Sequence, residues 1–187
     1  HFAKLSNGAY EPTIGPLVEL WNITGTDERE RESIPTEEEI NEKKALVNYK
    51  DLILEEGNSV YLSKKGMKLD LGGIVKGYAA DEVKRIFSEN GVNSAIIDLG
   101  GNIYALGEKT NGEAWKIGIQ DPFTVAGNYI GILNTKDSSI VTSGDYERYF
   151  VYNGERYHHI IDAKTGYPAK NEISGISIIS DKSIDGD

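Results

Sequence analysis

The apolar positions of the chain follow two spacings, one typical of helices and one typical of strands. The clearest helical spacing lies between residues 74 and 87, where apolar side chains recur every three or four positions and predict an amphipathic helix. Gly91 follows as a typical end of a helix. The predicted apolar face consists of Ile74, Tyr78, Ala79, Val83, Ile86 and Phe87.

Two further helices are expected nearer the start of the chain. A short apolar helix is predicted near Pro16–Trp21. Thr36 is a favourable N-cap, and Glu39 three residues later completes a capping box, so a helix is expected over residues 37–49. Between these two helices, residues 24–33 are polar and predict a loop.

Strands are predicted where short apolar runs are bounded by turn residues. Asn153-Gly154 lies between two alternating runs and predicts a hairpin with a type I′ turn. The expected strands are residues 52–54, 60–62, 67–71, 94–99, 103–106, 114–120, 129–133, 140–142, 146–152, 156–161 and 173–180. We therefore expect an α+β fold with mixed and antiparallel sheets and packed helices, in one domain over residues 1–187.

Composition excludes several classes of function. The 187 residues carry a net charge of −10 and no cluster of Lys and Arg, which argues against a nucleic-acid partner. The absence of cysteine excludes disulfides, thiolate metal sites and cysteine nucleophiles. No apolar run approaches the ~20 residues that a membrane-spanning helix needs.

The stretch KLDLGGIVKGYAADEVKRIF, residues 68–87, predicts a strand, a double-glycine turn and a helix. The start of a helix presents unpaired N–H groups and a partial positive charge, and Lys76 lies in the first turn, so the segment could bind a phosphate. An ordinary structural turn is the alternative, because the P-loop and dinucleotide patterns are absent. Gly77 inside the helix costs about 1 kcal/mol relative to alanine, which indicates close packing there.

Two aspartates and two histidines are further candidates for chemistry. Asp70 and Asp98 each precede Leu-Gly-Gly within an apolar run. Each of them either points outward or caps the glycine turn, or it holds a ligand or a metal, because a buried carboxylate needs a partner. His158 and His159 are neighbours on a predicted strand, so they would face opposite sides and one of them could face a cleft.

Five stretches, in the same order, resemble the motifs of the ApbE family, the flavin transferases that use FAD to attach FMN to proteins. The resemblance covers nearly all of residues 6–187 and implies an ApbE-like, T-fold-like α+β domain. The stretches are SNGAYEPTIGPLVELW, LDLGGIVKGYAADEV, IDLGGNIYALG, IVTSGDYERYF and YHHIIDAKTGYP.

The resemblance implies a Mg²⁺-dependent transferase. FAD would be the substrate, and its FMN phosphoryl group would move to a Thr or Ser hydroxyl of an acceptor flavoprotein, with release of AMP. The alternative is an FAD-binding protein, or an FAD pyrophosphatase that forms FMN and AMP without protein flavinylation. The resemblance also implies export to the bacterial cell envelope, at the outer face of the cytoplasmic membrane, through a lipid anchor outside this sequence.

The resemblance assigns roles to particular residues. His159 and Lys76 are expected to be catalytic, with His159 contacting the phosphates or assisting proton transfer. The metal is expected on the carboxylate of Asp187, with Asp185 as the alternative register, and on the carbonyl of Gly73. The expected FAD-binding residues are Lys76, Tyr78, Asp81, Asp98, Gly100, Gly101, Thr142, Ser143, His159 and Ile160.

The chain departs from the family pattern at its ends. The family's metal motif has a Thr four residues after the acid, which would lie beyond Asp187, and its N-terminal flavin-binding segment is absent. We therefore expect residues 1–187 to be one domain that is truncated at both ends. Thr142 and Ser143 are expected to line the same pocket.

Overall fold

The computed structural model describes residues 1–24, 26–124 and 127–187. It confirms the expected α+β class, with helices and mostly antiparallel sheets. The chain divides into two compact units. The first unit contains residues 1–71 and 145–172, and the second contains residues 72–144 and 173–187. The prediction of one domain over residues 1–187 stays a prediction.

The first unit combines short helices with a three-stranded sheet and a hairpin. In the sheet, of order β1-β9-β10, β1 runs parallel to β9 and β10 runs antiparallel to it, while β2 and β3 form the hairpin. The helical elements are α1 (Phe2–Leu5), α2 (Gly15–Trp21), α3 (Glu37–Lys44) and the 3₁₀ helix η1 (Tyr49–Asp51). The strands are β1 (Thr26–Glu30), β2 (Leu52–Glu55), β3 (Ser59–Leu62), β9 (Tyr149–Tyr152) and β10 (Glu155–His158).

An aromatic cluster forms the core of the first unit. Trp21 is fully buried and stacks near Phe150 and Tyr157, with ring centroids 6.4 and 5.7 Å away. The indole N–H of Trp21 donates to the carbonyl of Gly166 over 2.8 Å, which satisfies the polar group that a buried Trp must pair. The core thereby joins α2 to the β9–β10 hairpin and to the loop after it.

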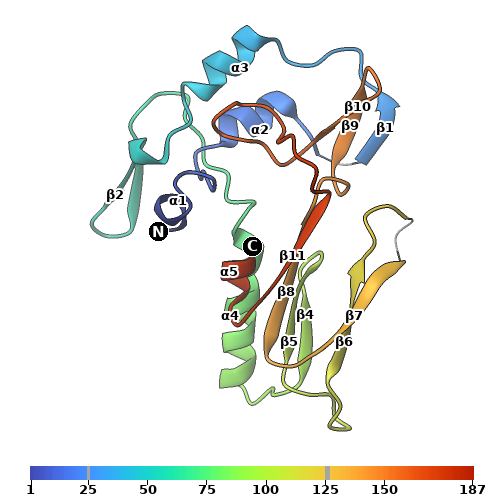
Figure 1. Ribbon diagram of the computed structural model, residues 1–187. Helices are drawn as coiled ribbons and strands as arrows, with labels where there is room; N and C mark the ends of the chain where they lie inside the picture. The colour runs from blue at the N-terminus through green and yellow to red at the C-terminus, as the bar shows by residue number, and fades with distance from the viewer. Residues whose placement is uncertain (25, 125–126) are drawn as a thin grey trace. The chain divides into compact units, whose positions relative to one another are not determined.

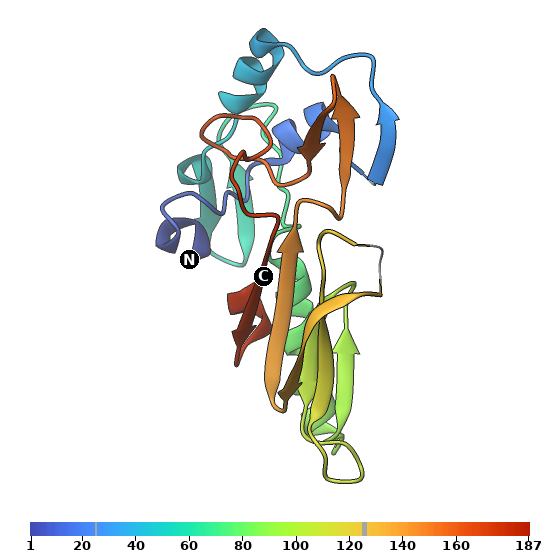
Figure 2. The same cartoon turned by 45° about the vertical axis from the view of Figure 1, so that its right-hand side comes forward.

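The second unit is a sheet with a long helix on one face (Figures 1 and 2). The sheet has the order β11-β8-β5-β4 and is antiparallel throughout, and β6 and β7 form a separate antiparallel pair. The helices are α4 (Val75–Glu89) and α5 (Ser183–Gly186). The strands are β4 (Ala95–Asp98), β5 (Asn102–Leu106), β6 (Trp115–Gln120), β7 (Tyr129–Thr135), β8 (Ser138–Gly144) and β11 (Gly175–Ser180).

The core of the second unit lies between α4 and the sheet. Ala80 of α4 is fully buried against Ile97 of β4 and Tyr104 and Leu106 of β5. Phe87 packs against the same cluster from the last turns of the helix. The predicted apolar face is confirmed only in part: Val83 and Phe87 pack against this cluster, whereas Tyr78 and Ile86 are exposed. The residues that α4 buries fully are Gly77 and Ala80.

Most predicted elements are confirmed, some with shifted ends, and two expectations are wrong. Residues 67–71 do not form a strand: Lys68 makes a single bridge to Ile14, because α2 begins at Gly15 and leaves no extended partner. The expected loop over residues 24–33 contains β1, whose backbone pairs with β9. Gly25 of that loop lies outside the described residues.

The helix expected over residues 37–49 ends at Lys44. Its capping box is confirmed, because the Thr36 side chain accepts from the Glu39 N–H and the Glu39 carboxylate accepts from the Thr36 N–H. The chain then turns into η1, where the Asn48 side chain accepts from the N–H of Lys50 and competes with a continuing helix.

The Asn153-Gly154 hairpin turn is confirmed. Both residues have positive φ, 50° and 73°, as a type I′ turn requires, and β10 pairs with β9 on either side of it.

Candidate functional site

The start of α4 carries several of the residues expected to hold a ligand. Gly72 and Gly73 lie in an exposed turn, and Ile74, the N-cap of α4, makes no side-chain capping hydrogen bond. The N–H of Gly77 instead donates to Oδ2 of Asp187 over 2.9 Å. A carboxylate is the group that a helix start favours, because the unpaired N–H groups and the helix dipole attract negative charge there.

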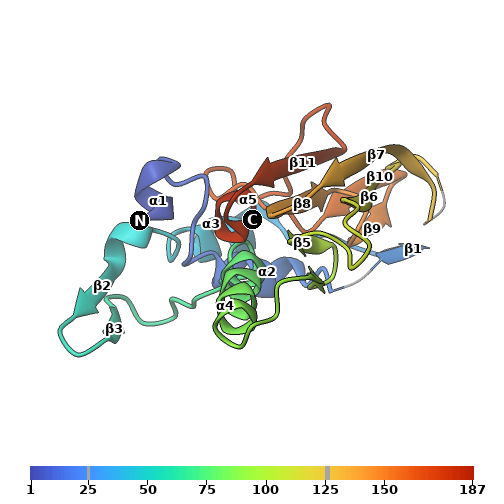
Figure 3. The ribbon, with the colours of Figure 1, turned by 90° about the horizontal axis from the view of Figure 1, so that it is seen from below.

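Gly77 confirms the close packing expected at this position of the helix. A Cβ built on Gly77 would lie 2.5 Å from the carbonyl oxygen of Ser183, 2.7 Å from Cα of Ile184 and 2.8 Å from Cβ of Asp187. Two of these three contacts are backbone atoms, which cannot turn aside as a flexible side chain would. The glycine therefore allows α5 to lie directly on α4 (Figure 3).

Lys76 and Tyr78 flank this glycine. Lys76 is half-buried, and no carboxylate among the described residues pairs with its ammonium group. The side chain of Tyr78 is 57% exposed. An unpaired cation at a helix start and an exposed aromatic ring can contact a phosphate and a flat ring system, respectively.

Asp81 lies one turn further along α4 and bonds to α5. Its two carboxylate oxygens accept from the N–H groups of Ser183 and Ile184 over 2.8 and 3.0 Å. Ser183 is fully buried, and its hydroxyl donates to Oδ1 of Asn102 over 2.5 Å. Sequence reasoning missed Ser183 and gave no role to Asn102, although Asn102 lies in the stretch IDLGGNIYALG, because neither residue belongs to an apolar spacing.

The second glycine motif is a hairpin turn between β4 and β5. Gly100 and Gly101 have φ values of 65° and 87°, and Leu99 donates to the carbonyl of Asn102 over 2.9 Å. The carboxylate of Asp98 accepts from the N–H of Gly101 over 3.0 Å. The structure shows the capped turn, which was one of the alternatives for Asp98. A role of Asp98 in ligand binding stays a prediction.

Thr142 and Ser143 are consecutive residues of β8, so their side chains point to opposite faces of the sheet. Thr142 bonds to the hydroxyl of its cross-strand partner Ser177 over 2.7 Å. Ser143 is exposed, on the face that carries Ser139 and α5. The expectation that both residues line one pocket stays a prediction.

The two neighbouring histidines belong to the first unit and bond differently. Nε2 of His158 donates to the carbonyl of Ala169 over 2.7 Å, and its Nδ1 accepts from the N–H of Ile160 over 3.3 Å. A carbonyl oxygen only accepts, so this geometry requires the neutral imidazole with its proton on Nε2. Both ring nitrogens of His158 are thus engaged in holding the backbone.

His159 has the opposite tautomer. Its Nδ1 donates to the carbonyl of Arg148 over 3.2 Å, so the lone pair of the neutral ring lies on Nε2. A histidine that is oriented through Nδ1 is suited to take up a proton at Nε2. Ile160, the other expected contact in this motif, follows with 39% of its side chain exposed.

Tyr146, in the stretch IVTSGDYERYF, has a shifted pKa. Burial raises the pKa of Tyr146 above its ordinary value, and the negative charges of Glu147 and Asp145 add to the rise. The phenol is therefore neutral and able to donate a hydrogen bond across the physiological pH range.

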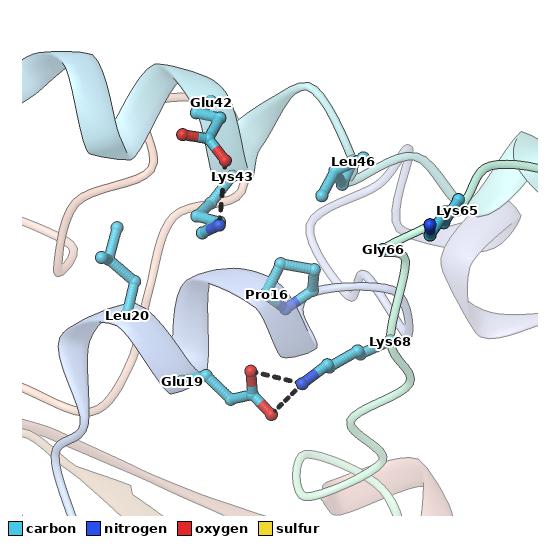
Figure 4. A pocket seen from close by; sticks show the side chains of 9 residues that line it. All are labelled: Pro16, Glu19, Leu20, Glu42, Lys43, Leu46, Lys65, Gly66 and Lys68. Atoms are coloured by element: carbon cyan, nitrogen blue, oxygen red, sulfur yellow. Dashed lines mark hydrogen bonds and ion pairs between the residues drawn. The ribbon is translucent and has the colours of Figure 1, made fainter.

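The first unit also contains an open cavity of about 650 Å³ (Figure 4). Lys68 and Glu19 form an ion pair at its edge over 2.5 Å. The lining residues are Pro16, Glu19, Leu20, Glu42, Lys43, Leu46, Lys65, Gly66 and Lys68. None of the residues expected at the site lines this cavity, and its charges are of mixed sign.

Metal-binding clusters and membrane-spanning helices are both absent from the described residues. Within residues 1–24, 26–124 and 127–187, no three or more His, Asp or Glu side chains gather as a metal-binding group. In the same part of the chain, no helix is both long and apolar enough to cross a membrane.

Together these features define an α+β protein whose second unit carries a carboxylate at one helix start, next to a lysine that has no ion-pair partner in the described part of the chain. The sequence pattern of the ApbE family matches residues 1–187, and the chain belongs to this family. It is 43% identical over 186 residues to the FAD:protein FMN transferase of Klebsiella pneumoniae strain 342, covering 99% of this chain and 56% of that protein.

A second curated relative and two solved structures are also similar to this chain. The FAD:protein FMN transferase of Treponema pallidum is 38% identical over 200 residues, which cover 100% of this chain and 54% of that protein. The crystal structure of the ApbE protein from Thermotoga maritima matches with a TM-score of 0.87 at 40% identity, covering 99% of this chain and 59% of that one. The flavin transferase ApbE from Vibrio cholerae matches with a TM-score of 0.82 at 31% identity, covering 98% and 57%.

The chain spans about half the length of the curated relatives it matches. Activity, substrate and partners are properties of those whole proteins, so they come to this chain as proposals.

Proposed function

We propose that the gene product containing this chain is an FAD:protein FMN transferase. It would move the FMN phosphoryl group of FAD to a Thr or Ser hydroxyl of an acceptor protein and release AMP. The relatives of this name, up to 43% identical, support the proposal. The observation that carries it is the carboxylate of Asp187 on the Gly77 N–H, next to the unpaired Lys76.

The start of α4 is proposed to hold the pyrophosphate of FAD. Lys76 supplies a positive charge there, and Gly72 and Gly73 allow close approach to the backbone. The exposed ring of Tyr78 is available to stack on the flavin or the adenine. These contacts would orient FAD and offset the charge that develops as its phosphate–oxygen bond breaks.

The donor atoms at this helix start fit a magnesium ion. Mg²⁺ prefers oxygen ligands and is commonly held by one or two carboxylates together with substrate phosphates. Asp187 supplies such a carboxylate, since the described residues give its Oδ1 no hydrogen-bond partner, and Gly73 is proposed to supply a carbonyl. A bound Mg²⁺ would supply charge neutralisation for the phosphate oxygens.

The transfer step then has a complete balance of atoms. The acceptor hydroxyl oxygen attacks the phosphorus of the FMN half, and the bond from that phosphorus to the bridging oxygen breaks. AMP leaves with the bridging oxygen. The resemblance to the family supports His159, whose Nδ1 donates to the carbonyl of Arg148, as the base that takes up the hydroxyl proton.

Export and attachment belong to the same proposal. The resemblance to the family supports a protein at the outer face of the bacterial cytoplasmic membrane, held by a lipid anchor outside these residues. The acceptor is proposed to be a flavoprotein at the same membrane face. Fractionation of the source cells followed by immunoblotting tests this location, and a protein found only in the cytosolic fraction would contradict it.

The site is tested by comparing two neighbouring acids in the whole gene product. Asp187→Ala is expected to abolish Mg²⁺-dependent release of AMP from FAD while FAD binding, followed by flavin fluorescence, persists. Asp185→Ala is the matched control, because Asp185 is exposed in α5, two residues before Asp187, and represents the alternative register. Loss of turnover in Asp185→Ala alone would move the metal to Asp185, and unchanged turnover in both variants would remove the metal site from α5.

A further inference from the structure

A buried polar cluster lies beneath α5 in the second unit; among the described residues, Nδ2 of its member Asn102 has no hydrogen-bond partner. The hydroxyl of Ser139 on β8 donates to the hydroxyl of Ser183 over 2.9 Å, and that hydroxyl donates to Oδ1 of Asn102 on β5 over 2.5 Å. All three side chains are fully buried. Buried polar groups are costly unless they are paired, so this chain of hydrogen bonds specifies where Ser183 lies.

Asp81 fixes the same helix from the other side. Its carboxylate accepts the N–H groups of both Ser183 and Ile184, the first two residues of α5. These N–H groups have no partner inside a helix, and a carboxylate at a helix start is favoured by the dipole. Asp81 therefore fixes the orientation of α5 as well as its position.

The short length of α5 makes these contacts decisive. A helix of four residues is not stable by its own hydrogen bonds, because nucleation costs more than one turn returns. Its packing is also close: a Cβ on Gly186 would lie 3.0 Å from Cγ2 of Val141. The conformation of α5 is thus set by Asp81, by the buried cluster and by the close packing at Gly77 and Gly186.

The residue that follows α5 is Asp187. Its distance from Ser183 is one turn, and the N–H of Asp187 donates to the carbonyl of Ser183 over 3.1 Å. The carboxylate then reaches the N–H of Gly77 on α4. Any change in the tilt of α5 therefore moves the carboxylate of Asp187 relative to the start of α4.

We propose that Asp81, with the buried Asn102–Ser183–Ser139 cluster behind it, is a positioning residue for the metal-binding carboxylate of Asp187. This inference rests on the proposed function and deepens it. In this role Asp81 acts through α5 and needs no contact with FAD, which differs from the FAD-binding role expected from its motif. Groups that orient a metal ligand commonly change metal affinity by about 10- to 100-fold when they are removed.

The test measures metal binding and FAD binding separately in the whole gene product. Mn²⁺ serves as the metal probe, with free Mn²⁺ measured by electron paramagnetic resonance in the absence of FAD. FAD affinity is measured by flavin fluorescence in the absence of metal. Asp81→Ala is expected to weaken Mn²⁺ binding by about 10-fold or more and to leave FAD affinity unchanged.

Three further variants keep the test sharp if Asp81→Ala folds poorly. Asp81→Asn keeps one acceptor oxygen and is expected to recover part of the Mn²⁺ affinity. Ser183→Ala keeps the N–H bonded to Asp81 but breaks the buried cluster, and is expected to weaken Mn²⁺ binding as well. Glu82→Ala is the matched control, because this neighbouring carboxylate of α4 pairs with Arg85 and is expected to leave both affinities unchanged.

Turnover gives an independent readout. The positioning role predicts that Asp81→Ala raises the Mg²⁺ concentration needed for half-maximal AMP release, with KM for FAD unchanged and kcat largely recovered at saturating Mg²⁺. Weaker FAD binding with unchanged Mn²⁺ affinity would overturn the proposal and make Asp81 an FAD contact. Unchanged affinities in Asp81→Ala and Ser183→Ala would also overturn it. A wild-type protein that binds neither Mn²⁺ nor FAD would instead overturn the proposed function, and the positioning role with it.

Discussion

The backbone N–H of Gly77 donates to the carboxylate of Asp187 over 2.9 Å, although 110 positions separate the two residues. This bond joins the last residue of the chain to the first turn of α4, where Lys76 also lies. This contact brings an acid and a cation together at one helix start. The local conformation of either residue alone would not bring them together. The following predictions test what that assembly does.

Gly77→Ala should destabilise the protein more than an ordinary glycine substitution. The new methyl group would meet the backbone of Ser183 and Ile184, and overpacking of this kind costs typically about 1–3 kcal/mol in the free energy of unfolding. Urea denaturation measures the change. Gly131→Ala is the control, because a Cβ there meets no atom of the described structure within 4 Å and the residue does not have positive φ. Equal effects of the two substitutions would show that α5 does not pack on Gly77 in solution.

Lys76→Ala should weaken the binding of FAD. A hydrogen bond to a charged group contributes roughly 1.5–3 kcal/mol, so FAD affinity should fall by an amount in that range. A flavin fluorescence titration measures the dissociation constant. Lys116→Ala removes an exposed lysine from the same unit and should leave it unchanged. If both variants bind FAD as the wild type does, Lys76 is not a phosphate contact.

His159→Gln should slow transfer and leave FAD binding intact. Removing a general base typically costs about 10²–10⁴-fold in rate, and AMP release under saturating FAD measures it. His158→Gln is the comparison, since both nitrogens of His158 bond to the backbone of the first unit. That variant should lower thermal stability and affect turnover less. The reverse order of effects on turnover would reassign the proton acceptor to His158.

The capping box of α3 gives a prediction about stability that is independent of the active site. Thr36→Ala removes a side chain that accepts from the N–H of Glu39, and loss of an N-cap costs about 1 kcal/mol in the free energy of unfolding. Thermal denaturation measures the change. Thr36→Ser keeps the hydroxyl and should retain most of the stability; a loss as large as that of the alanine variant would mean that the cap is not formed.

The same box predicts a dependence on pH. Hydrogen bonds from the N–H and then the hydroxyl of Thr36 lower the pKa of Glu39 below its ordinary value. Because the folded pKa is the lower one, Glu39 stabilises the fold above its unfolded pKa, and this contribution is lost as pH falls through the folded pKa. Glu39→Gln should therefore reduce stability at neutral pH and lose that difference in acid. A difference from the wild type that persists unchanged at acid pH would contradict the assignment.

Local sequence was sufficient where one short segment determines the conformation. Thr36 with Glu39 predicted the capping box, and Asn153-Gly154 predicted the type I′ turn, because positive φ at two positions leaves little choice of turn. The sequence DLGG occurs twice and adopts two conformations, which the tertiary structure decides. The first copy leads into α4, whereas Gly100 and Gly101 of the second copy have positive φ and form a hairpin turn.

The elements that were missed depend on distant partners. The polar strand β1 is held by backbone pairing with β9. Helix α5 is held by hydrogen bonds to Asp81 and Ser139. The spacing of apolar residues cannot indicate these contacts. At the site, the sequence predicted that some part of the chain packs on Gly77 but did not indicate which part. It named Asp81 as a ligand contact, whereas in the structure both of its oxygens bond to α5.

The central claim is the transfer of FMN to a protein, and intact-mass spectrometry of the acceptor tests it most directly. The whole gene product is incubated with FAD, Mg²⁺ and an acceptor flavoprotein that has a Thr or Ser at its flavinylation site. We expect an acceptor that is heavier by one covalently attached FMN, with one AMP released for each acceptor modified, and neither product with Asp187→Ala. Release of AMP and free FMN with an acceptor of unchanged mass, or no use of FAD at all, would contradict it.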